Sequence, residues 1–308
     1  MEGFLSVLKP PGITSHEAVE YLRRLCGVRK VGHAGTLDPM ACGVLPMAIG
    51  RATRLLEFLA GQSKSYRAEM LLGVTTTTQD LEGEVLSRQE VPPLRQELVR
   101  EVLAQFLGGY RQVPPMYSAL HYRGRRLYEL ARAGREVTRP ARPVTIERLE
   151  LLRLTPDGPY WRLLLDVRCG AGTYVRTLCA DIGKRLGYGG CLAFLVRTGF
   201  GPFSLTASHT PEELRRAAEE GRLGAMVLPL DYPLSALPRA MVREAALPRV
   251  RHGQPVPETA VVWEAGNPPP GAGPVRLYEP QGRLVAIALY TKDAQLVMRK
   301  VFGQEEDD

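Results

Sequence analysis

An aspartate and a histidine lie among small and apolar residues near the N-terminus, and they give the strongest sign of chemistry in the chain. Asp38 precedes Pro39 in a segment rich in glycine and proline, residues 32–46. Proline fixes its own φ and disfavours the helical region for the residue before it, so we expect Asp38 at the tip of a stiff turn. His33 is the other residue of this loop that can carry charge near neutral pH. A carboxylate held in this way can act toward a bound ligand as a nucleophile or as a base.

An Asp-Pro pair by itself is typical of an ordinary turn, and short motifs match by chance. The match in this chain is longer. His-Ala-Gly-Thr-Leu-Asp-Pro occupies residues 33–39, and Gly-Val-Leu-Pro follows at residues 43–46. This string resembles the active-site loop of the TruB family of tRNA pseudouridine synthases. The resemblance implies that Asp38 is the catalytic aspartate and that His33 fills the place of a target base that is flipped out of the RNA.

Two further motifs carry the same resemblance. Lys-x-Tyr-Arg at residues 64–67 resembles the motif whose tyrosine stacks on the target base, a role that falls on Tyr66. Gly-Thr-Tyr-Val-Arg at residues 172–176 resembles the motif in which Tyr174 lines the uracil pocket and Arg176 pairs with the catalytic carboxylate. Together with the loop aspartate, Tyr66 and Arg176 are the residues that we expect to carry the catalysis.

Two weaker motifs imply contacts to the substrate. Lys-Pro-x-Gly followed by Thr-Ser, beginning at Lys9, resembles the first motif of these synthases. In Leu-Ala-Phe-Leu-Val-Arg-Thr-Gly, the resemblance implies that Leu195 packs against the base, with Arg197 nearby. The chain departs from the common pattern here, because Cys191 and Val196 stand where a His-like residue and a second basic residue are often found. This departure concerns local backbone contacts and not the chemistry.

The charge of the chain favours a nucleic-acid partner. The formal net charge is +7 over 308 residues, and arginine is far more frequent than lysine. Guanidinium groups pair bidentately with phosphate, although charge alone does not exclude a basic protein that binds no nucleic acid. Arg54 lies in an expected helix over residues 51–60, close in sequence to the Asp38 loop. We interpret it as a candidate phosphate-binding residue, while a solvated helix face is the commoner use of such an arginine.

Capping and periodicity predict the elements that position these residues. Thr14 and Glu17 form a capping box before a helix that Gly27 ends. Residues 32–43 are expected to form an ordered loop, because glycine and proline interrupt both helix and strand. Strands are expected at residues 4–8, 44–49, 68–72, 144–154 and 161–169, and further helices at residues 51–60, 94–107, 125–133, 175–186 and 211–220.

Basic residues alternate with tyrosines between residues 117 and 142. Such a segment can follow an RNA backbone and stack on bases. The alternative is a short amphipathic surface helix with charged flanks. In the family that the chain resembles, this segment belongs to an insertion that clasps the RNA arm. The resemblance therefore favours an RNA contact, and an enzyme that acts without a guide RNA.

The C-terminal part of the chain has a different composition, with short apolar runs separated by prolines and glycines that indicate a small barrel. Arg-His-Gly-Gln-Pro-Val at residues 251–256 resembles a turn of the PUA domain, an RNA-binding barrel. We expect a catalytic domain over residues 1–235, a PUA-like domain over residues 236–304 and an acidic tail over residues 305–308. The implied fold class is α+β, a large mixed and mainly antiparallel sheet with surrounding helices plus a small C-terminal β-barrel.

Composition also predicts where the protein is found and what it does not bind. No apolar run is long enough to span a bilayer, and the N-terminus lacks the features of a signal peptide, so we expect a cytoplasmic protein that binds no membrane. The five cysteines form no C-x-x-C pair, which indicates reduced thiols and no zinc site. Cys42 lies in the Asp38 loop without an adjacent base and is interpreted as a packing residue.

The implied reaction converts uridine 55 of the tRNA T-loop to pseudouridine. The N1–C1′ bond breaks, the uracil turns and C5 joins C1′, so we expect neither a metal nor a cofactor. Asp38 can attack C1′ or C6, or help to remove a proton from C2′, and these routes stay open. The expected partner is the T-arm of tRNA, bound by a monomer, and a secondary role in tRNA folding is an additional expectation.

Two alternative functions stay open at this point. One is a guide-RNA-dependent synthase of the dyskerin kind, and the other is a non-catalytic RNA-binding protein. The presence of Asp38, Tyr66 and Arg176 argues against the second alternative as the only role of the chain.

Overall fold

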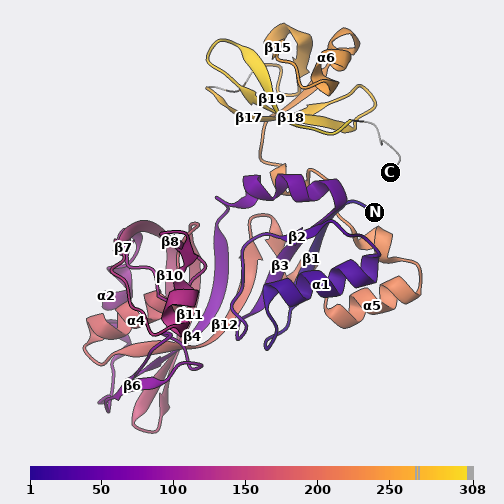
Figure 1. Cartoon of the computed structure of the whole chain (residues 1–308). Coiled ribbons are helices and arrows are strands. Elements are labelled where there is room, and N and C mark those ends of the chain that lie inside the picture. Colours follow the sequence, from indigo (N-terminus) through magenta and orange to yellow (C-terminus); the bar gives the residue numbers. More distant parts are fainter. Residues whose placement is uncertain (268, 270, 304–308) are drawn as a thin grey trace.

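The computed structural model describes residues 1–267, 269 and 271–303. Two large β-sheets organise the chain, one of nine strands within residues 3–204 and one of six strands within residues 239–301. Figure 1 shows the smaller unit stacked on the end of the larger one, near the N-terminus. The acidic tail predicted at residues 305–308 lies outside the described residues.

The nine-stranded sheet forms the centre of the larger unit. Its strands are β1 (Gly3–Lys9), β2 (Val31–His33), β3 (Cys42–Ile49), β4 (Lys64–Leu72), β7 (Gly108–Gln112), β10 (Arg142–Asp157), β11 (Tyr160–Cys169), β12 (Gly190–Phe200) and β13 (Phe203–Ser204). Their order is β1-β3-β12-β4-β11-β10-β7, with β2 paired to β3 and β13 paired to β12. The ladder between β12 and β3 is parallel, whereas the other ladders of this sheet are antiparallel. The sheet is therefore mixed and mainly antiparallel, which confirms the predicted fold class.

Helices pack on this sheet through their apolar faces and build the main hydrophobic core. They are α1 (Ser15–Cys26), α2 (Gln96–Ala104), α4 (Val175–Leu186) and α5 (Pro211–Glu219). The 3-10 helix η1 (Gly50–Leu59) places its buried residues in a separate cluster. The capping box predicted for α1 is confirmed, because Thr14 Oγ1 accepts from the Glu17 amide at 3.1 Å and Glu17 accepts from the Thr14 amide at 2.7 Å. Gly27 ends the helix with φ +66°, in the left-handed region that favours glycine.

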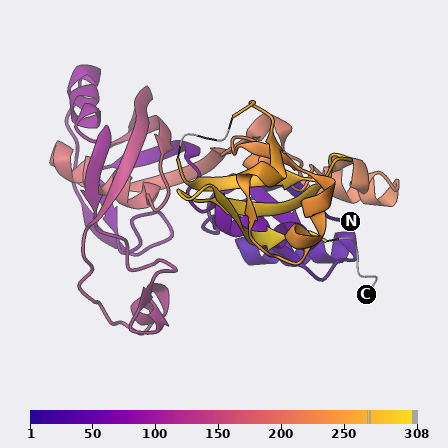
Figure 2. The ribbon, with the colours of Figure 1, turned by 90° about the horizontal axis from the view of Figure 1, so that it is seen from above.

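Smaller elements extend from the larger unit. A hairpin joins β5 (Val74–Thr76) to β6 (Val85–Arg88), and a second hairpin of β8 (His121–Tyr122) and β9 (Arg125–Arg126) leads into α3 (Leu127–Arg132). In the view of Figure 2, the segment that carries α3 projects away from the rest of the molecule. The short 3-10 helices η2 (Leu205–Ala207) and η3 (Leu223–Met226) precede and follow α5 in the chain, and η4 (Tyr232–Leu234) leads to the smaller unit.

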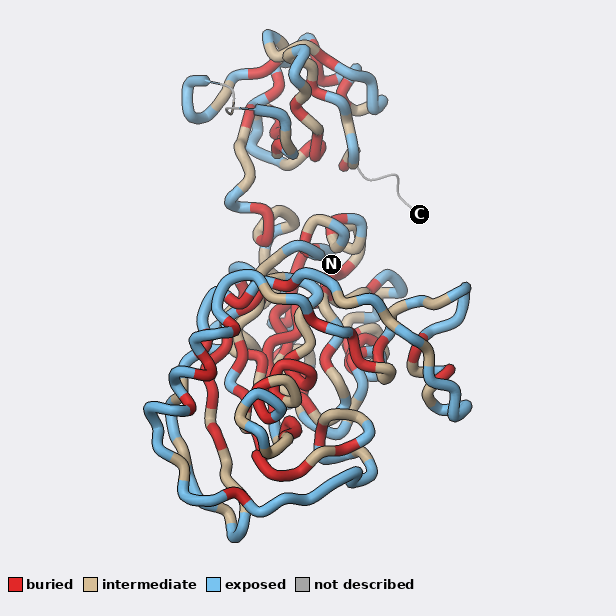
Figure 3. The backbone as a smooth tube through the Cα atoms, turned by 90° about the vertical axis from the view of Figure 1, so that its left-hand side faces the viewer, coloured by how far each residue is buried: buried red, intermediate tan, exposed pale blue. Residues whose placement is uncertain are grey.

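The smaller unit is a barrel-like sheet with its own hydrophobic core. Its elements are β14 (Arg239–Val242), η5 (Glu244–Ala246), α6 (Leu247–Arg251), β15 (Val256–Pro257), η6 (Glu258–Ala260), β16 (Val261–Trp263), β17 (Gly273–Tyr278), β18 (Leu284–Tyr290) and β19 (Gln295–Val301). The strand order is β15-β19-β18-β17-β14-β16. Figure 3 shows buried positions gathered in the interior of each unit.

The two units share a third apolar cluster at their junction. Phe302 and Ile287 of the smaller unit are buried there together with Leu55 and Leu59 of η1. Polar contacts accompany this packing, and Lys300 pairs with Glu57 at 2.6 Å. Truncation of the smaller unit would therefore expose part of the core of the larger one.

Several predicted boundaries are wrong for physical reasons. Gly32 and His33 belong to β2, because their backbones pair with Ala48 and Met47 of β3, and this ladder overrides their low strand propensity. The predicted helix over residues 51–60 is 3-10 rather than α-helical. The helices predicted at residues 94–107 and 125–133 are shorter, at Gln96–Ala104 and Leu127–Arg132.

Candidate active site

Asp38 lies in the loop between β2 and β3, and backbone hydrogen bonds hold this loop against the N-terminal segment. The Gly12 amide donates to the Pro39 carbonyl at 2.8 Å, and the Ala41 amide donates to the Asp38 carbonyl at 3.1 Å. Ser15 at the start of α1 accepts from the Leu37 amide at 2.9 Å. The backbone of Asp38 is therefore fixed on both sides, while its side chain stays 39% exposed.

Arg176 holds the carboxylate of Asp38 with two nitrogens. Its Nε lies 2.9 Å from Oδ2, and its Nη2 donates to Oδ1 at 3.3 Å. Arg176 is the second residue of α4, and its side chain is only 6% exposed. A buried guanidinium in this two-point geometry fixes both the charge and the direction of the carboxylate. The structure thus brings together the two residues that the sequence separates by 138 positions.

The remaining nitrogens of Arg176 are also engaged. Nη1 donates to the Thr78 carbonyl and Nη2 to the Tyr117 carbonyl, each at 2.9 Å. Asp80, whose side chain is 5% exposed, places Oδ2 3.5 Å from Nη1. Because two further segments, the turn of Thr78 and Asp80 and the segment of Tyr117, contact the guanidinium, its position is determined by the fold rather than by Asp38 alone.

The sequence around Asp80, with Gly83 three residues later, is typical of a turn, and the contact of Asp80 with Arg176 cannot be read from it. The residues do form a turn, in which one carboxylate oxygen of Asp80 accepts from the Thr78 hydroxyl and from the Glu82 amide. Its other oxygen faces Arg176 across 96 positions of sequence. An acidic residue two positions after a run of threonines was the available signal, but nothing in the sequence specifies which cation it meets.

Tyr174 precedes α4 as its N-cap residue, and Gln112 fixes its backbone from β7. Gln112 Oε1 accepts from the Tyr174 amide at 2.8 Å, and its Nε2 donates to the Tyr174 carbonyl at 3.1 Å. Gln112 is 1% exposed. Burial raises the pKa of Tyr174, and a hydrogen bond with Ser118 opposes this shift. The tyrosine is therefore held at the start of the helix that carries Arg176, and Gln112 is a second positioning residue that the sequence did not reveal.

Tyr66, Leu195 and Arg197 share one face of the large sheet. Tyr66 on β4 is directly opposite Arg197 on β12, and Leu195 is opposite Ala68. Tyr66 and Leu195 are 6% and 5% exposed. Burial raises the pKa of Tyr66 to about 12, while the nearby charge of Arg197 opposes the shift and that of Asp38 adds to it. The phenol is therefore neutral near pH 7, and its side chain lies within electrostatic reach of Asp38.

Arg197 is a buried residue that donates hydrogen bonds to the backbone on both sides of Asp38. Its Nε donates to the Val44 carbonyl at 2.6 Å and its Nη2 to the Gly35 carbonyl at 2.9 Å. The side chain is fully buried, and its guanidinium lies 5.3 Å from the centre of the Phe200 ring. Gly35 has φ +68°, and a Cβ there would come 2.6 Å from the Phe200 ring. The position therefore requires glycine, and its contacts give Arg197 a role in shaping the loop, whereas its predicted substrate contact stays a prediction.

Lys9 is buried beneath the same loop, at the end of β1. Its Nζ donates to the carbonyls of Ile13 at 2.6 Å, Pro10 at 2.9 Å and Pro39 at 3.3 Å. Burial lowers its pKa to about 8, although the Cys42 and Asp38 charges oppose this shift. Lys9 therefore ties the first motif to the catalytic loop, and the structure offers it no direct contact with Asp38.

His33 ends β2 and lies partly buried beside the loop. Its Nδ1 is buried and has no hydrogen-bond partner among the residues that the structure describes. Burial lowers the pKa of His33, and the positive charge of Arg197 lowers it further. The predicted role of His33 as a wedge in the RNA stays a prediction.

Arg54 does not join this group of residues. Its Nη1 donates to the Val301 carbonyl at 2.7 Å, and its guanidinium lies 5.4 Å from the centre of the Phe302 ring. Both contacts belong to the smaller unit. The structure gives Arg54 a role at the junction of the two units, and phosphate binding by this residue stays a prediction.

Among residues 1–267, 269 and 271–303, no three metal-binding side chains gather at one place. Within the same part of the chain, none of the helices has the length and hydrophobicity needed to cross a bilayer.

The fold matches solved structures over nearly the whole chain. The structure titled "Crystal structure of the archaeal box H/ACA sRNP Nop10-Cbf5 complex" has a TM-score of 0.74 at 27% identity, and the match covers 99% of this chain and 87% of that one. A Cbf5-Nop10-Gar1 complex gives the same TM-score at 26% identity, over 98% and 85% of the two chains. The architecture is the pseudouridine synthase fold, and the paired Asp38 and Arg176 lie on it.

Sequence comparisons identify the family. Residues 23–175 match the family model described as "TruB family pseudouridylate synthase (N terminal domain)", and residues 176–235 match the "tRNA pseudouridylate synthase B C-terminal domain". A tRNA pseudouridine synthase B of Moorella thermoacetica is 49% identical over 95% of both chains. One of Heliobacterium modesticaldum is 42% identical over 99% of this chain and 97% of its own. The chain belongs to the TruB family of pseudouridine synthases.

Proposed function

We propose that this enzyme isomerises uridine 55 in the T-loop of tRNA to pseudouridine, without a guide RNA, and that Asp38 is the catalytic residue. The observation that carries the proposal is the two-point pair between Asp38 and the buried Arg176. The curated relatives named above are tRNA pseudouridine synthases B, which supports tRNA as the substrate.

The pair supplies what the reaction requires of a carboxylate. Asp38 must be ionised to attack C1′ or C6 of the uridine, or to help to take a proton from C2′. Arg176 stabilises that charge, and because its own position is held by Thr78, Tyr117 and Asp80, it also directs the carboxylate. The half-exposed side chain of Asp38 is open to an incoming ligand.

The surrounding residues fit a flipped uracil. Tyr66 supplies a neutral aromatic face, and Leu195 and Tyr174 lie on neighbouring elements. Removing a base from its stack costs a few kcal/mol. His33, with its unsatisfied buried nitrogen, would fill the space that the base leaves and so offset part of this cost.

Action without a guide RNA is supported by the inserted segment that carries α3. Cation–aromatic contacts order this segment, because Arg126 and Arg132 lie 5.9 and 5.6 Å from the centre of the Tyr128 ring. These exposed groups are suited to the backbone and bases of an RNA arm. The structural neighbours come from H/ACA complexes, so a guide-dependent enzyme is the second candidate. We also propose a monomeric, cytoplasmic enzyme, for which the five free cysteines are suited.

Incubation of the purified chain with an unmodified tRNA transcript, followed by mapping of pseudouridine, tests the proposal. We expect modification at position 55 without added guide RNA, and none by Asp38→Asn, which keeps the shape but removes the charge. Asp166→Asn is the control, since Asp166 is likewise paired with arginines, Arg148 and Arg67, but lies buried away from this site. Modification by Asp38→Asn at the wild-type rate, or a strict need for a second RNA, would contradict the proposal.

A further inference from the structure

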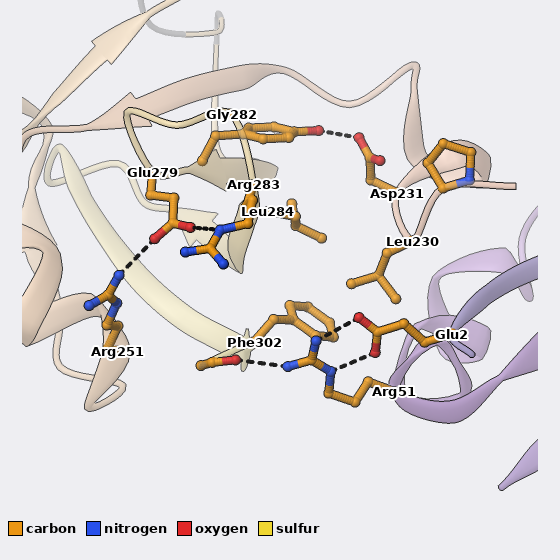
Figure 4. A pocket seen from close by; sticks show the side chains of 13 residues that line it. Glu2, Arg51, Leu230, Asp231, Arg251, Glu279, Gly282, Arg283, Leu284 and Phe302 are labelled. Atoms are coloured by element: carbon orange, nitrogen blue, oxygen red, sulfur yellow. Dashed lines mark hydrogen bonds and ion pairs between the residues drawn. The ribbon is translucent and has the colours of Figure 1, made fainter. Parts of the chain in front are cut away.

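The cavity between the two units holds ion pairs among the residues that line it (Figure 4). Arg51 pairs with Glu2 in the larger unit, and Arg251 and Arg283 pair with Glu279 in the smaller one. Because the arginines and carboxylates of its walls balance each other, the cavity does not favour a charged ligand. The feature that bears on the reaction is instead the turn that contacts Arg176.

Gln79 lies in that turn, with a backbone conformation that residues other than glycine rarely adopt. Its φ is +65°, in the left-handed region, where a residue with a Cβ is strained and glycine is not. Among the residues that the structure describes, Arg123 and Ala294 are the other non-glycine residues with positive φ. Such strain persists only where the surroundings hold the residue, and strained residues gather at functional sites.

The residues on either side of Gln79 both contact the guanidinium of Arg176. The Thr78 carbonyl accepts from Nη1 at 2.9 Å, and Asp80 Oδ2 lies 3.5 Å from the same nitrogen. The relative direction of these two acceptors depends on the dihedral angles of the residue between them. Relaxation of Gln79 to negative φ would therefore turn at least one acceptor away from Arg176.

Two hydrogen bonds hold Gln79 in its strained conformation. Its carbonyl accepts from the Leu192 amide of β12 at 2.9 Å, and its side-chain Oε1 accepts from the Thr177 hydroxyl of α4 at 2.7 Å. Thr177 directly follows Arg176 and is 3% exposed. A threonine inside a helix can give its hydroxyl to a carbonyl of the preceding turn, whereas this hydroxyl donates to another segment. The bond between Thr177 and Gln79, here called the latch, thus joins the turn to the helix that carries Arg176.

We propose that Gln79 is a positioning residue of this enzyme, whose latch to Thr177 keeps Arg176 directed at Asp38. The proposal rests on the proposed function for the role of Asp38. While the latch is closed, the turn presents its two acceptors to Nη1, and Nε and Nη2 of Arg176 stay directed at the Asp38 carboxylate. When the latch is lost, Gln79 relaxes and the guanidinium loses part of the support that fixes its direction.

Replacement of Gln79 by alanine and by glycine separates this role from that of an ordinary loop residue. Gln79→Ala removes the latch but keeps a Cβ, so the turn should relax and the single-turnover rate at saturating tRNA should fall about 10-fold. Gln79→Gly also removes the latch, but glycine adopts the same φ without strain, so the rate should fall no more than about 3-fold. The affinity for tRNA should stay within a few-fold of the wild type in both variants, because the latch acts on Arg176 and not on the RNA. Equal rates in the two variants, with melting temperatures that show both to be folded, would overturn the proposal.

The Thr177 side of the latch gives an independent test. Thr177→Val keeps the shape but removes the hydroxyl, and its rate should fall about as far as that of Gln79→Ala, whereas Thr177→Ser keeps the donor and should retain most of the activity. In Thr177→Val/Gln79→Gly the rate should return to that of Gln79→Gly, because glycine needs no latch. A double variant as slow as Thr177→Val would contradict the proposal. Ala294→Gly is the matched control, because Ala294 has φ +54° in the smaller unit, and relief of its strain should change the melting temperature but not the rate.

The Nε–H proton of Arg176 reports the same geometry without turnover. Its nuclear magnetic resonance signal in isotope-labelled protein is identified by its loss in Arg176→Lys. The pair with Asp38 should make its exchange with solvent slow, and the slow exchange should be kept in Gln79→Gly and lost in Gln79→Ala. Absence of pseudouridine formation by the wild type would contradict the proposed function, whereas this signal would still decide on the latch, since equal exchange in the two variants would overturn it.

Discussion

Asp38 and Asp80 lie on opposite edges of one guanidinium group. Arg176 presents Nε and Nη2 to Asp38, and Nη1 to Asp80 at 3.5 Å. Asp38 is half-exposed, whereas Asp80 is buried. The buried carboxylate can therefore hold the arginine in place while the exposed one engages the substrate.

This relationship makes Asp80 a positioning residue. Asp80→Asn keeps the bond from the Glu82 amide but weakens the hold on Arg176, because an amide is neutral. We expect single-turnover pseudouridine formation to fall roughly 10-fold, with tRNA affinity within a few-fold of the wild type. A purely structural role would instead lower the melting temperature while the rate at saturating tRNA stayed unchanged. Asp166→Asn is again the control, because Asp166 is a buried aspartate between two arginines on another face of the sheet.

Arg176 itself should tolerate neither removal nor a change of geometry. Arg176→Ala leaves Asp38 and Asp80 without their cation. Because Asp38 then loses the group that holds its charge and direction, we expect near-complete loss of activity. Breaking a buried pair also typically costs about 3–5 kcal/mol of stability, which should lower the melting temperature. Arg176→Lys keeps the charge but loses the fork, and its single-turnover rate should be intermediate, roughly 10-fold to 100-fold below the wild type.

The Arg176→Lys variant also separates two roles for this residue. Because Arg176 is buried inside the site, tRNA affinity should change little. Strongly weakened binding together with a wild-type saturated rate would mean that Arg176 contacts the RNA backbone and that its pairing with Asp38 has no catalytic role.

His33 is expected to act on the RNA rather than on the bond that breaks. His33→Ala should lower the rate on structured tRNA roughly 10-fold, and should have less effect on a substrate whose T-loop stacking is already disrupted, because that base is cheaper to flip. Parallel single-turnover assays on the two substrates measure the difference. Equal losses on both would indicate a chemical role.

Local signals in the sequence were sufficient to predict the helices whose ends are capped and the strands whose apolar residues alternate. The helix after Thr14 and the pair of strands β10 and β11 were predicted closely. The boundaries failed where a partner strand decides the backbone conformation, as at Gly32 and His33. Pairing with β3 stabilises an extended chain there, and this partner cannot be read from the local residues.

Partners that are distant in sequence also explain which residues of the site were predicted and which were missed. The resemblance named Asp38 and Arg176, whereas Asp80 and Gln112 were missed because their partners lie 96 and 62 positions away. Arg54 illustrates the opposite case, since closeness to the loop in sequence suggested a place in the site, and the structure points it at the smaller unit. Contacts between distant segments decide these roles, and only the fold specifies them.

The pKa of Tyr66 predicts a specific alkaline loss of stability. Burial raises this pKa to about 12, whereas an unfolded tyrosine ionises near pH 10. Between these values the unfolded chain releases the proton and the folded chain keeps it, so the folded state binds more protons and its stability falls as pH rises. The contribution of the neutral Tyr66 phenol to the free energy of unfolding is fully present below about pH 10 and is lost by about pH 12. A difference of two units between the folded and unfolded pKa of this tyrosine corresponds to about 2–3 kcal/mol.

Tyr66→Phe removes this titration while keeping the aromatic ring. Denaturant unfolding of the two proteins from pH 8 to pH 11.5 should therefore show that the wild type loses stability relative to Tyr66→Phe as the pH rises above about 10. A stability difference that stays constant over this range would mean that the folded protein does not protect the phenol, and Tyr66 would then be open to solvent rather than buried. Because the ring is retained, base stacking should survive in Tyr66→Phe, and its tRNA affinity at pH 8 should stay within a few-fold of the wild type.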